Sequence, residues 1–580
     1  MHWKTSILLW LLSITTAGWS TSTDSLSVST DSLATSRADY SFPEHTMRPF
    51  WDTADLFRQR TDITRFAFTE PGRPVFWARG NQFPHQMTFS LNGLPLTNPL
   101  NGLVNLGHIT PDYVASAYID RASDSTRGDE DLALFSRYRN SEEPYSRLNY
   151  YEGDFNLSNF NAYFSRRYGS RLNIQLAGQN SAYDGWAPGM FSDRFSYHAR
   201  MDAFIDSSST LTFFYNFSKN NARMANFGEW SDYSFKTYYA RYHWRYTRTG
   251  AGGFTLDAAW MPQGASLASS RDSFATRHYN ERFYTRLSKA LQAGPHHIRA
   301  QLALDNVTYS LNDARRSFYN QADLTFSHAW SLGDHWRWQN RISGSMRERS
   351  PLALQAESGI DMRGGKIDAG LKLTHRERLP LPVEIDSPEQ DNPTENHDGV
   401  TLHATYQPLT GFRLFIHGSA WRATHTIRFD GARFYREDKR TGQEARLGFQ
   451  WTGQRIELSG AYRHQWTTLH IAPRDRATAR ITYRDAWFND RMFVYFTVGW
   501  QAWQTHNILR FNPQTVRFYA IDTMDNNPVQ ILWFKGVIRV SDIEFYMTAD
   551  NLLSTDYSYI DGYPEQLRRL RFGLNWEIFN

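Results

Sequence analysis

The chain has 580 residues, with 63 Lys and Arg against 59 Asp and Glu, and its formal charge of +4 is too small to favour nucleic acid as a partner. Cysteine is absent, which excludes disulfides, thiolate metal sites, iron–sulfur clusters and cysteine nucleophiles. A mean hydropathy of −0.60 excludes a bundle of membrane-spanning helices, because these need repeated apolar runs of about 20 residues.

The amino terminus has the order of a secretory signal peptide. A basic start reaches Lys4, an apolar stretch covers residues 7–14, and small residues follow up to Ser20. We therefore predict a cleaved signal peptide over residues 1–20. The alternative is a retained anchor, but the apolar core is shorter than the roughly 17 to 25 residues that span a bilayer. Residues 21–42 are rich in Ser, Thr and Asp, which predicts a disordered periplasmic tail.

The next segment, residues 43–136, carries short and mixed α/β signals. Residues 52–60 are predicted to form a helix and residues 87–91 a strand. This segment is predicted to be a small domain that is distinct from the rest of the chain.

From residue 147 to residue 580 the sequence alternates apolar and polar residues over stretches of about ten. In the last stretch the apolar set is Leu570, Phe572, Leu574, Trp576 and Ile578, and the polar set is Arg571, Gly573, Asn575 and Glu577. A period of two predicts strands with two chemically different faces. Division at the turn-forming residues gives 22 candidate strands between residues 147 and 580.

The connections between these strands are of two kinds. Every even-to-odd connection is short, while several odd-to-even connections are long, namely residues 183–193, 222–234, 375–398, 429–443, 505–527 and 554–565. This layout predicts an all-β fold, a 22-stranded antiparallel transmembrane β-barrel over residues 147–580. The alternative is a soluble all-β protein such as a propeller or a string of sandwiches. A barrel of this width needs something to fill it, which makes residues 43–136 a candidate plug.

Several short motifs carry a resemblance to a known family. In the plug-like segment they are Asp55-Leu56-Phe57, Arg79-Gly80, Phe89 to Leu96 with Asn92-Gly93 and Pro95, Asn105-Leu106, and Ile109 to Val114 with Pro111. Near the carboxyl end they are Asp550 to Tyr557 and Gly562-Tyr563-Pro564. In order and spacing these motifs resemble the TonB-dependent outer-membrane receptors. The resemblance implies that Arg79, Gly80, Asn92, Gly93, Pro95 and Pro111 belong to a plug motif.

The chain also departs from that family. Residues 119–130 lack the family's Arg-Gly-Pro element and Gly-rich stretch, so the second half of the plug is predicted to be short or divergent. Family members carry a short box that pairs with the energising protein as an added strand. The candidate here is Asp24, Ser25, Leu26, Ser27 and Val28.

No catalytic motif is found, and we predict no enzyme, cofactor or metal site. His403, His417 and His425 could meet on neighbouring strands, but solvated lumen or loop histidines are the simpler interpretation. The acidic stretch 384–398 is interpreted as a solvated external loop and alternatively as a calcium site.

Two further sets of side chains have two interpretations each. Trp244, Trp500, Trp503, Trp533 and Trp576 are interpreted as interface girdle residues and alternatively as a grip on cargo. Arg241 and Arg245 would either favour anionic solutes or balance acidic plug residues such as Asp129.

The resemblance implies a monomeric receptor in the outer membrane of a Gram-negative envelope, importing a small solute of unknown identity by TonB-type energy coupling. Its expected partners are outer-membrane lipid, a TonB-type periplasmic domain, the barrel-assembly machinery and that solute. The alternatives are a passive channel derived from such a receptor, and a surface-binding barrel without transport.

Overall fold

The structure is a computed structural model. It describes residues 40–41, 60–68, 75–79, 82–110, 113–119, 132–185, 189–224, 228–245, 252–269, 274–312, 316–348, 350, 352–381, 384, 394–431, 434–504, 506–513, 515–565 and 568–579. No helix in this part of the chain is both long and apolar enough to cross a membrane. The predicted signal peptide, residues 21–39 of the predicted tail with the box at residues 24–28, and almost all of the helix at 52–60 lie outside the described residues. The last part of the predicted disordered tail is corrected, because Tyr40–Ser41 form a short strand that pairs with residues 116–117.

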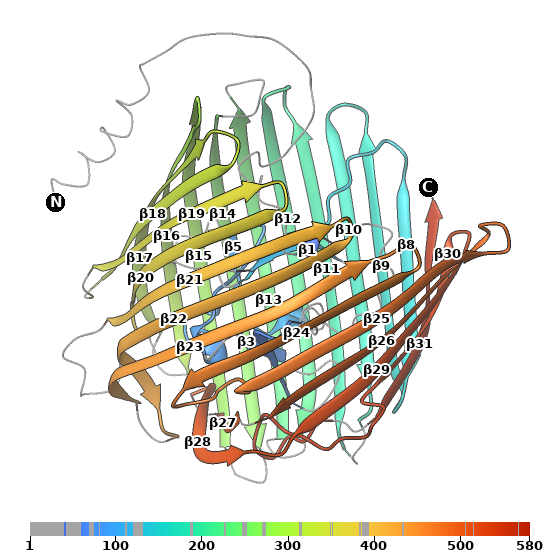
Figure 1. Cartoon of the computed structure of the whole chain (residues 1–580). Helices are drawn as coiled ribbons and strands as arrows, with labels where there is room; N and C mark the ends of the chain where they lie inside the picture. The colour runs from blue at the N-terminus through green and yellow to red at the C-terminus, as the bar shows by residue number, and fades with distance from the viewer. Residues whose placement is uncertain are drawn as a thin grey trace.

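A closed antiparallel barrel of 22 strands dominates the molecule, which confirms the predicted fold class (Figure 1). The first half comprises β8 (Tyr145–Gly153), β9 (Leu157–Tyr168), β10 (Leu172–Tyr183), β11 (Phe191–Phe204), β12 (Ser209–Met224), β13 (Gly228–Arg245), β14 (Gly253–Ser269), β15 (Phe274–Ala293), β16 (His296–Leu311), β17 (Ser317–Leu332) and β18 (Trp336–Arg347). The second half comprises β19 (Ala353–Gly364), β20 (Ile367–Arg378), β21 (Glu395–Leu409), β22 (Phe412–Phe429), β23 (Phe434–Thr452), β24 (Ile456–Thr467), β25 (Asp475–Trp487), β26 (Met492–Gln504), β29 (Val529–Val540), β30 (Ile543–Asp550) and β31 (Arg569–Phe579). β31 pairs with β8 and closes the ring.

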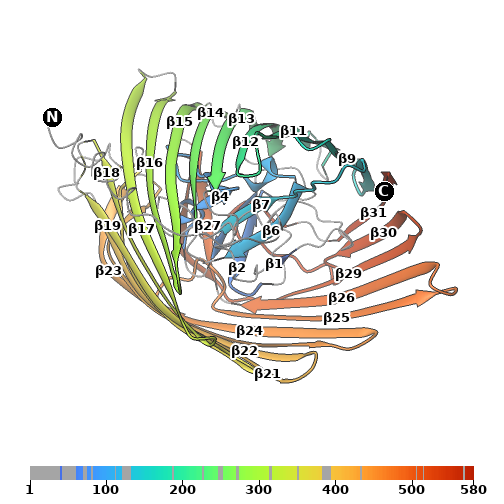
Figure 2. The same ribbon diagram turned by 90° about the horizontal axis from the view of Figure 1, so that it is seen from above.

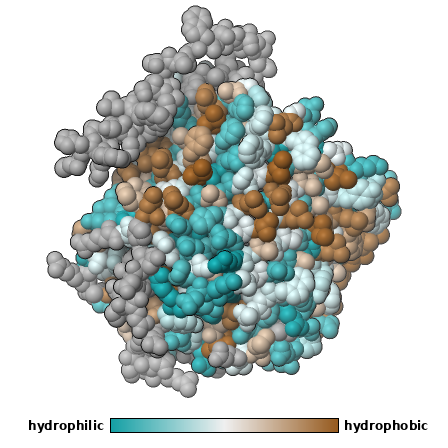
Figure 3. All heavy atoms as spheres, turned by 60° about the vertical axis from the view of Figure 1, so that its left-hand side comes forward, coloured by the Kyte–Doolittle hydropathy of each residue, from teal (hydrophilic) through white to brown (hydrophobic). Residues whose placement is uncertain are grey.

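The two faces of the barrel wall follow the alternation in the sequence. On β31 the side chains of Phe572 and Trp576 are 59% and 42% exposed, while Arg571 and Asn575 are 1% and 4% exposed. The apolar side chains therefore point outward and the polar ones into the lumen. Apolar patches spread over one side of the outer wall in Figure 3. A closed barrel with an apolar outer wall is the arrangement that lets strands cross a bilayer, because it leaves no unpaired backbone edge.

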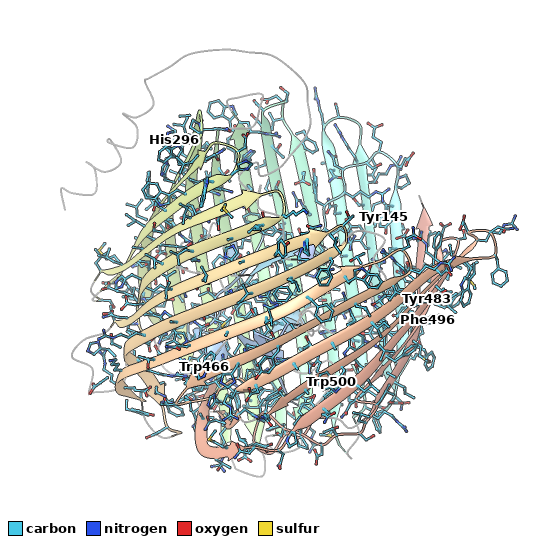
Figure 4. All side chains as sticks on the ribbon, viewed as in Figure 1. Tyr145, His296, Trp466, Tyr483, Phe496 and Trp500 are labelled. Atoms are coloured by element: carbon cyan, nitrogen blue, oxygen red, sulfur yellow. The ribbon has the colours of Figure 1, made fainter. Side chains whose placement is uncertain are left out.

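Aromatic side chains mark the outer wall near both strand ends. Trp244, Trp336, Trp451 and Trp487 are 38–45% exposed at the end of the barrel with the short turns. Figure 4 shows Trp466 and Trp500 toward the opposite end from His296. Trp244 and Trp576 thus fit the interface-girdle interpretation. Trp503 and Trp533 do not, because they are 5% and 8% exposed. The ring of Trp503 lies in the lumen and stacks on Tyr559 at 5.6 Å.

We call the end with the long connections the outer end of the barrel. Two of the predicted long connections are mostly strand: β12 ends at Met224 and β13 begins at Gly228, and β22 ends at Phe429 and β23 begins at Phe434. These predictions were wrong because the strand ends carry polar residues on both faces, which erases the alternation. A third connection, between β26 and β29, contains a separate hairpin of β27 (His506–Asn512) and β28 (Arg517–Asp525).

The plug lies inside the barrel (Figures 1 and 2). Its described strands are β1 (Tyr40–Ser41), β2 (Ile63–Ala67), β3 (Val75–Arg79), β4 (Phe89–Leu91), β5 (Leu94–Pro95), β6 (Val114–Ile119) and β7 (Leu132–Ser136), with short 3-10 helices η3 (Pro84–Gln86) and η4 (Leu106–His108). One sheet has the order β1-β6-β7-β4-β5, and β2 pairs with β3. The predicted strand at residues 87–91 is β4. Leu91, Leu106, Leu132 and Leu134 form a core that continues into barrel residues such as Tyr284.

Candidate functional site

The plug is fastened to the barrel at the Asn92–Gly93 turn. Both residues have positive φ, 54° and 78°, as a two-residue turn between β4 and β5 requires. The Asn92 amide accepts a hydrogen bond from the Ser136 backbone N–H at 3.0 Å and donates to the Ser136 hydroxyl at 2.9 Å. This asparagine therefore joins the turn to the end of β7. A Cβ at residue 93 would lie 2.9 Å from the guanidinium of Arg286, so the close approach needs glycine.

Three barrel arginines, which we call the arginine clamp, hold the backbone of this turn. Arg241 donates to the Asn92 carbonyl at 3.1 Å, and Arg286 donates to the Gly93 carbonyl at 2.9 Å. Arg282 donates to the carbonyls of Pro95 and Thr97 at 3.3 and 3.4 Å. Because the acceptors are backbone carbonyls, the clamp binds the turn through its backbone conformation and does not contact its side chains through these hydrogen bonds.

Barrel carboxylates hold the clamp in place. Asp257 lies between Arg241 and Arg286, with N···O distances of 2.7 and 2.6 Å, and Asp305 pairs with Arg282 at 2.8 Å. The side chains of Arg282, Asp257 and Asp305 are 0% exposed. Charges buried this deeply stay ionised only when they are paired. Arg241 is thus engaged by Asp257 and a plug carbonyl, while Asp129 lies outside the described residues.

Other predicted plug residues are placed as follows. Pro95 is in β5 and Arg79 is the last residue of β3, whereas Gly80 and Pro111 lie outside the described residues. Further barrel-to-plug contacts occur where Arg446 pairs with Asp62 at 3.3 Å and Arg194 donates to the Gly107 carbonyl at 3.1 Å. The plug is thereby attached on several sides of the lumen.

The hairpin of β27 and β28, which we call the lumen hairpin, covers the plug at the outer end. Its Phe511 and Phe518 pack on Phe68 and Phe76 of the plug, with ring centroids 5.1 Å apart for Phe511 and Phe68 and 5.4 Å apart for Phe518 and Phe76. Tyr563, from the connection between β30 and β31, lies 4.9 Å from Phe68. These five rings, the aromatic cluster, are each at most 4% exposed. They form a buried apolar contact of the plug with the lumen hairpin and with the connection between β30 and β31.

Polar contacts hold the lumen hairpin from both sides. Toward β30–β31, the Leu509 N–H donates to the Tyr559 carbonyl at 3.0 Å and Arg510 pairs with Asp561 at 2.6 Å. Toward β22–β23, Asn512 donates to the Gly431 carbonyl at 3.1 Å. The hairpin is therefore fixed to the loops around it as well as to the plug.

A buried ion cluster forms the third attachment of the hairpin. Glu384 accepts from the Leu381 N–H at 2.6 Å and pairs with Arg517 of β28 at 3.0 Å and with Arg378 at 3.2 Å. Burial alone would raise the pKa of Glu384, but the charges of Arg378 and Arg517 hold it below its usual value. The carboxylate is thus ionised at neutral pH and bridges the β20–β21 connection to the hairpin. This result corrects the solvated-loop interpretation for Glu384, which is 1% exposed.

The same cluster reaches the plug. His85 of η3 is 7% exposed, and burial together with the nearby Arg517 and Arg378 lowers its pKa well below the usual value. Burial likewise lowers the pKa of Arg517 to about 10, so this arginine remains charged at neutral pH. The charges of Arg378 and Arg517 therefore act on both Glu384 of the β20–β21 connection and His85 of the plug.

The three histidines His403, His417 and His425 do not come together as one group. His403 and His417 are directly paired on β21 and β22, but His425 lies eight residues further along β22, about 26 Å away. Within the described part of the chain, no group of three or more His, Asp or Glu side chains is arranged to hold a metal ion.

The comparisons with known proteins give the same architecture. No protein-family model matches the sequence, and no curated protein matches it. Among solved structures, the copper transporter OprC has a TM-score of 0.77 at 11% identity over 91% of this chain and 96% of that chain. The FrpB iron transporter from Neisseria meningitidis gives 0.74 at 9% identity, and the siderophore receptor PirA from Acinetobacter baumannii gives 0.73 at 10%, both over 91% of this chain and 96% of theirs. The predicted resemblance is thus confirmed at the level of the fold: this chain has the plug-and-barrel fold of the TonB-dependent receptors.

Proposed function

We propose that this protein is an outer-membrane receptor that binds a solute at its outer end and imports it by TonB-type energy coupling. The observation that carries the proposal is the plug, which is clamped in the lumen by Arg241, Arg282 and Arg286 beneath a closed aromatic cluster. A lumen blocked at two levels suits regulated import, because solute crosses only after the blocking parts move. The structural neighbours described as transporters of copper and iron, and as a siderophore receptor, support the same class of function.

The passive-channel alternative fits these contacts less well. A passive channel needs a continuous aqueous path, whereas here the wall arginines hold the plug backbone at several points. A surface-binding protein without transport would use the external loops and would not need a plug that moves.

Energy coupling is tested by deleting residues 24–28. We expect uptake of the protein's solute by whole cells to fall to the level of a strain lacking the protein, while solute binding to purified protein stays unchanged. The physical reason is that the added strand transmits force and does not contact the cargo. A matched control deletes residues 29–33 from the same tail. Normal uptake after the first deletion would show that the coupling segment lies elsewhere or that transport is passive.

A further inference from the structure

A cavity of about 80 Å³ lies under the tip of the lumen hairpin, between the plug and the outer halves of β13, β14 and β15. Its floor is the plug segment that carries Asn98, Asn101 and Asn105, and its wall includes Gln263 and Asn280 of the barrel. Val516, at the hairpin tip, also lines it. The cavity therefore lies where solute arriving from the outer end would first meet the plug.

The lining of this cavity carries no formal carboxylate or guanidinium charge. None of the described residues that line it is Asp, Glu, Lys or Arg; its polar groups are carboxamides, Ser234 and the imidazoles of His108 and His278. A second cavity of about 70 Å³ offers a contrast, because Arg65, Arg476, Asp550, Glu565 and Arg569 line it. An uncharged lining is therefore not a property that all cavities of this lumen share.

Carboxamides suit one kind of ligand in particular. Each carboxamide offers a donor and an acceptor side by side, which matches hydroxyl groups that both donate and accept. The cavity also has aromatic walls, Trp230 and Phe235, which favour the C–H face of a sugar-like ring. A charged group would lose its hydration here without gaining a counter-charge.

The side-chain carbonyl oxygen of Asn280, in the cavity lining, is unsatisfied. The Asn280 side chain is 1% exposed, and its Oδ1 has no hydrogen-bond partner in the structure. Buried polar atoms are rarely left unsatisfied, so this carbonyl oxygen is available to a donor that enters the cavity.

The lid of the cavity is strained. Val516 has φ of 52°, in the left-handed region, where a β-branched residue is a genuine outlier. Val516 is 6% exposed and lines the cavity. Strained residues persist only where the surroundings over-determine them, so lifting the tip both relieves Val516 and enlarges the cavity.

We propose that this cavity binds an uncharged, polyhydroxylated group of the imported solute, and that the group enters when Val516 lifts. This inference rests on the proposed receptor function and names its substrate class. In the closed form the volume suffices for only a few water molecules, so a whole ring fits only after the hairpin tip has moved.

The test is calorimetric titration of the purified full-length barrel in detergent with three probes of similar size: glucose, gluconate and glucosamine. Glucose is expected to bind with a millimolar dissociation constant, and each charged probe at least about tenfold more weakly, because the cavity offers no counter-charge. Asn280→Leu, which removes the unsatisfied carbonyl oxygen, and, separately, Gln263→Leu are expected to weaken glucose binding by at least about tenfold. Gln454→Leu, in an exposed turn at the other end of the barrel, is the matched control. Heat-modified gel mobility verifies that each variant is folded.

Val516→Ala adds a readout of access. It removes part of a side chain that lines the cavity, so glucose should bind several-fold more tightly. The inference is overturned if glucose does not bind, if gluconate binds equally well, or if the cavity variants behave like Gln454→Leu. Because no transport is measured here, normal uptake after the deletion of residues 24–28 would show that the coupling segment lies elsewhere or that transport is passive, and it would leave this binding result unchanged.

Discussion

Replacing Glu384 with glutamine is expected to open the lumen hairpin. The substitution removes the carboxylate that pairs with Arg517, while Arg378 keeps Glu395 as a partner, and breaking one side of a buried ion pair costs about 3–5 kcal/mol. The open population of the hairpin should therefore rise by at least about a hundredfold. The barrel strands should be unaffected, because Glu384 lies in the connection between β20 and β21.

The chain has no cysteine, so a single introduced thiol can be labelled specifically. Val516→Cys places one thiol at the hairpin tip, and its rate of reaction with a maleimide in detergent solution reports exposure. Val516→Cys combined with Glu384→Gln should label at least about tenfold faster than Val516→Cys alone. The control combines Val516→Cys with Asp398→Asn. The Asp398 carboxylate belongs to the same region, is 56% exposed and pairs with His375, which is 45% exposed. Its removal should therefore leave the labelling rate unchanged. Equal labelling rates in all three proteins would show that the ion cluster does not hold the hairpin.

The second large effect is expected at the arginine clamp. The triple variant Arg282→Gln, Arg286→Gln and Asp305→Asn removes the guanidinium donors to the Gly93, Pro95 and Thr97 carbonyls. It leaves Asp257 paired with Arg241, so no buried carboxylate loses its only partner. Hydrogen bonds to charged groups contribute about 1.5–3 kcal/mol each, and the attachment of the plug should weaken by several such contributions.

This effect is measured as channel opening in urea. Planar bilayers containing the triple variant should show conductance steps at a clearly lower urea concentration than wild type, because the plug detaches before the barrel unfolds. Arg484→Gln with Glu457→Gln removes a wall pair of 2.9 Å from β24 and β25 and is the matched control. Opening of the triple variant at the same urea concentration as this control would mean that the clamp does not retain the plug.

The barrel could be predicted from the sequence because lipid and lumen impose opposite chemistry on alternate residues. Leu570 and Phe572 are exposed on the outer wall and Arg571 is buried, as the alternation indicates. The same signal was present in the lumen hairpin, where Leu509 and Phe511 alternate with polar residues. It was missed because these strands are short and lie inside a connection that was expected to be irregular.

The candidate site could be predicted only in part, since its contacts join distant parts of the chain. The Asn92–Gly93 turn is a local signal, but Arg286, which grips it, is separated from Gly93 by 193 positions. Trp503 was grouped with the girdle because strand patterning does not say where a lumen-facing aromatic replaces a lipid-facing one. The sequence indicates a solvated Glu384 because no local signal identifies its partner Arg517, which lies in the lumen hairpin.

The central claim is that the clamped plug closes the lumen, and conductance of the purified mature protein in a planar lipid bilayer tests it most directly. Heat-modified gel mobility first establishes that the barrel is folded. We expect an electrically silent protein, because wall arginines hold the plug in the lumen and the aromatic cluster packs over it. Large and stable channels from folded wild-type protein would contradict it and would favour the passive channel.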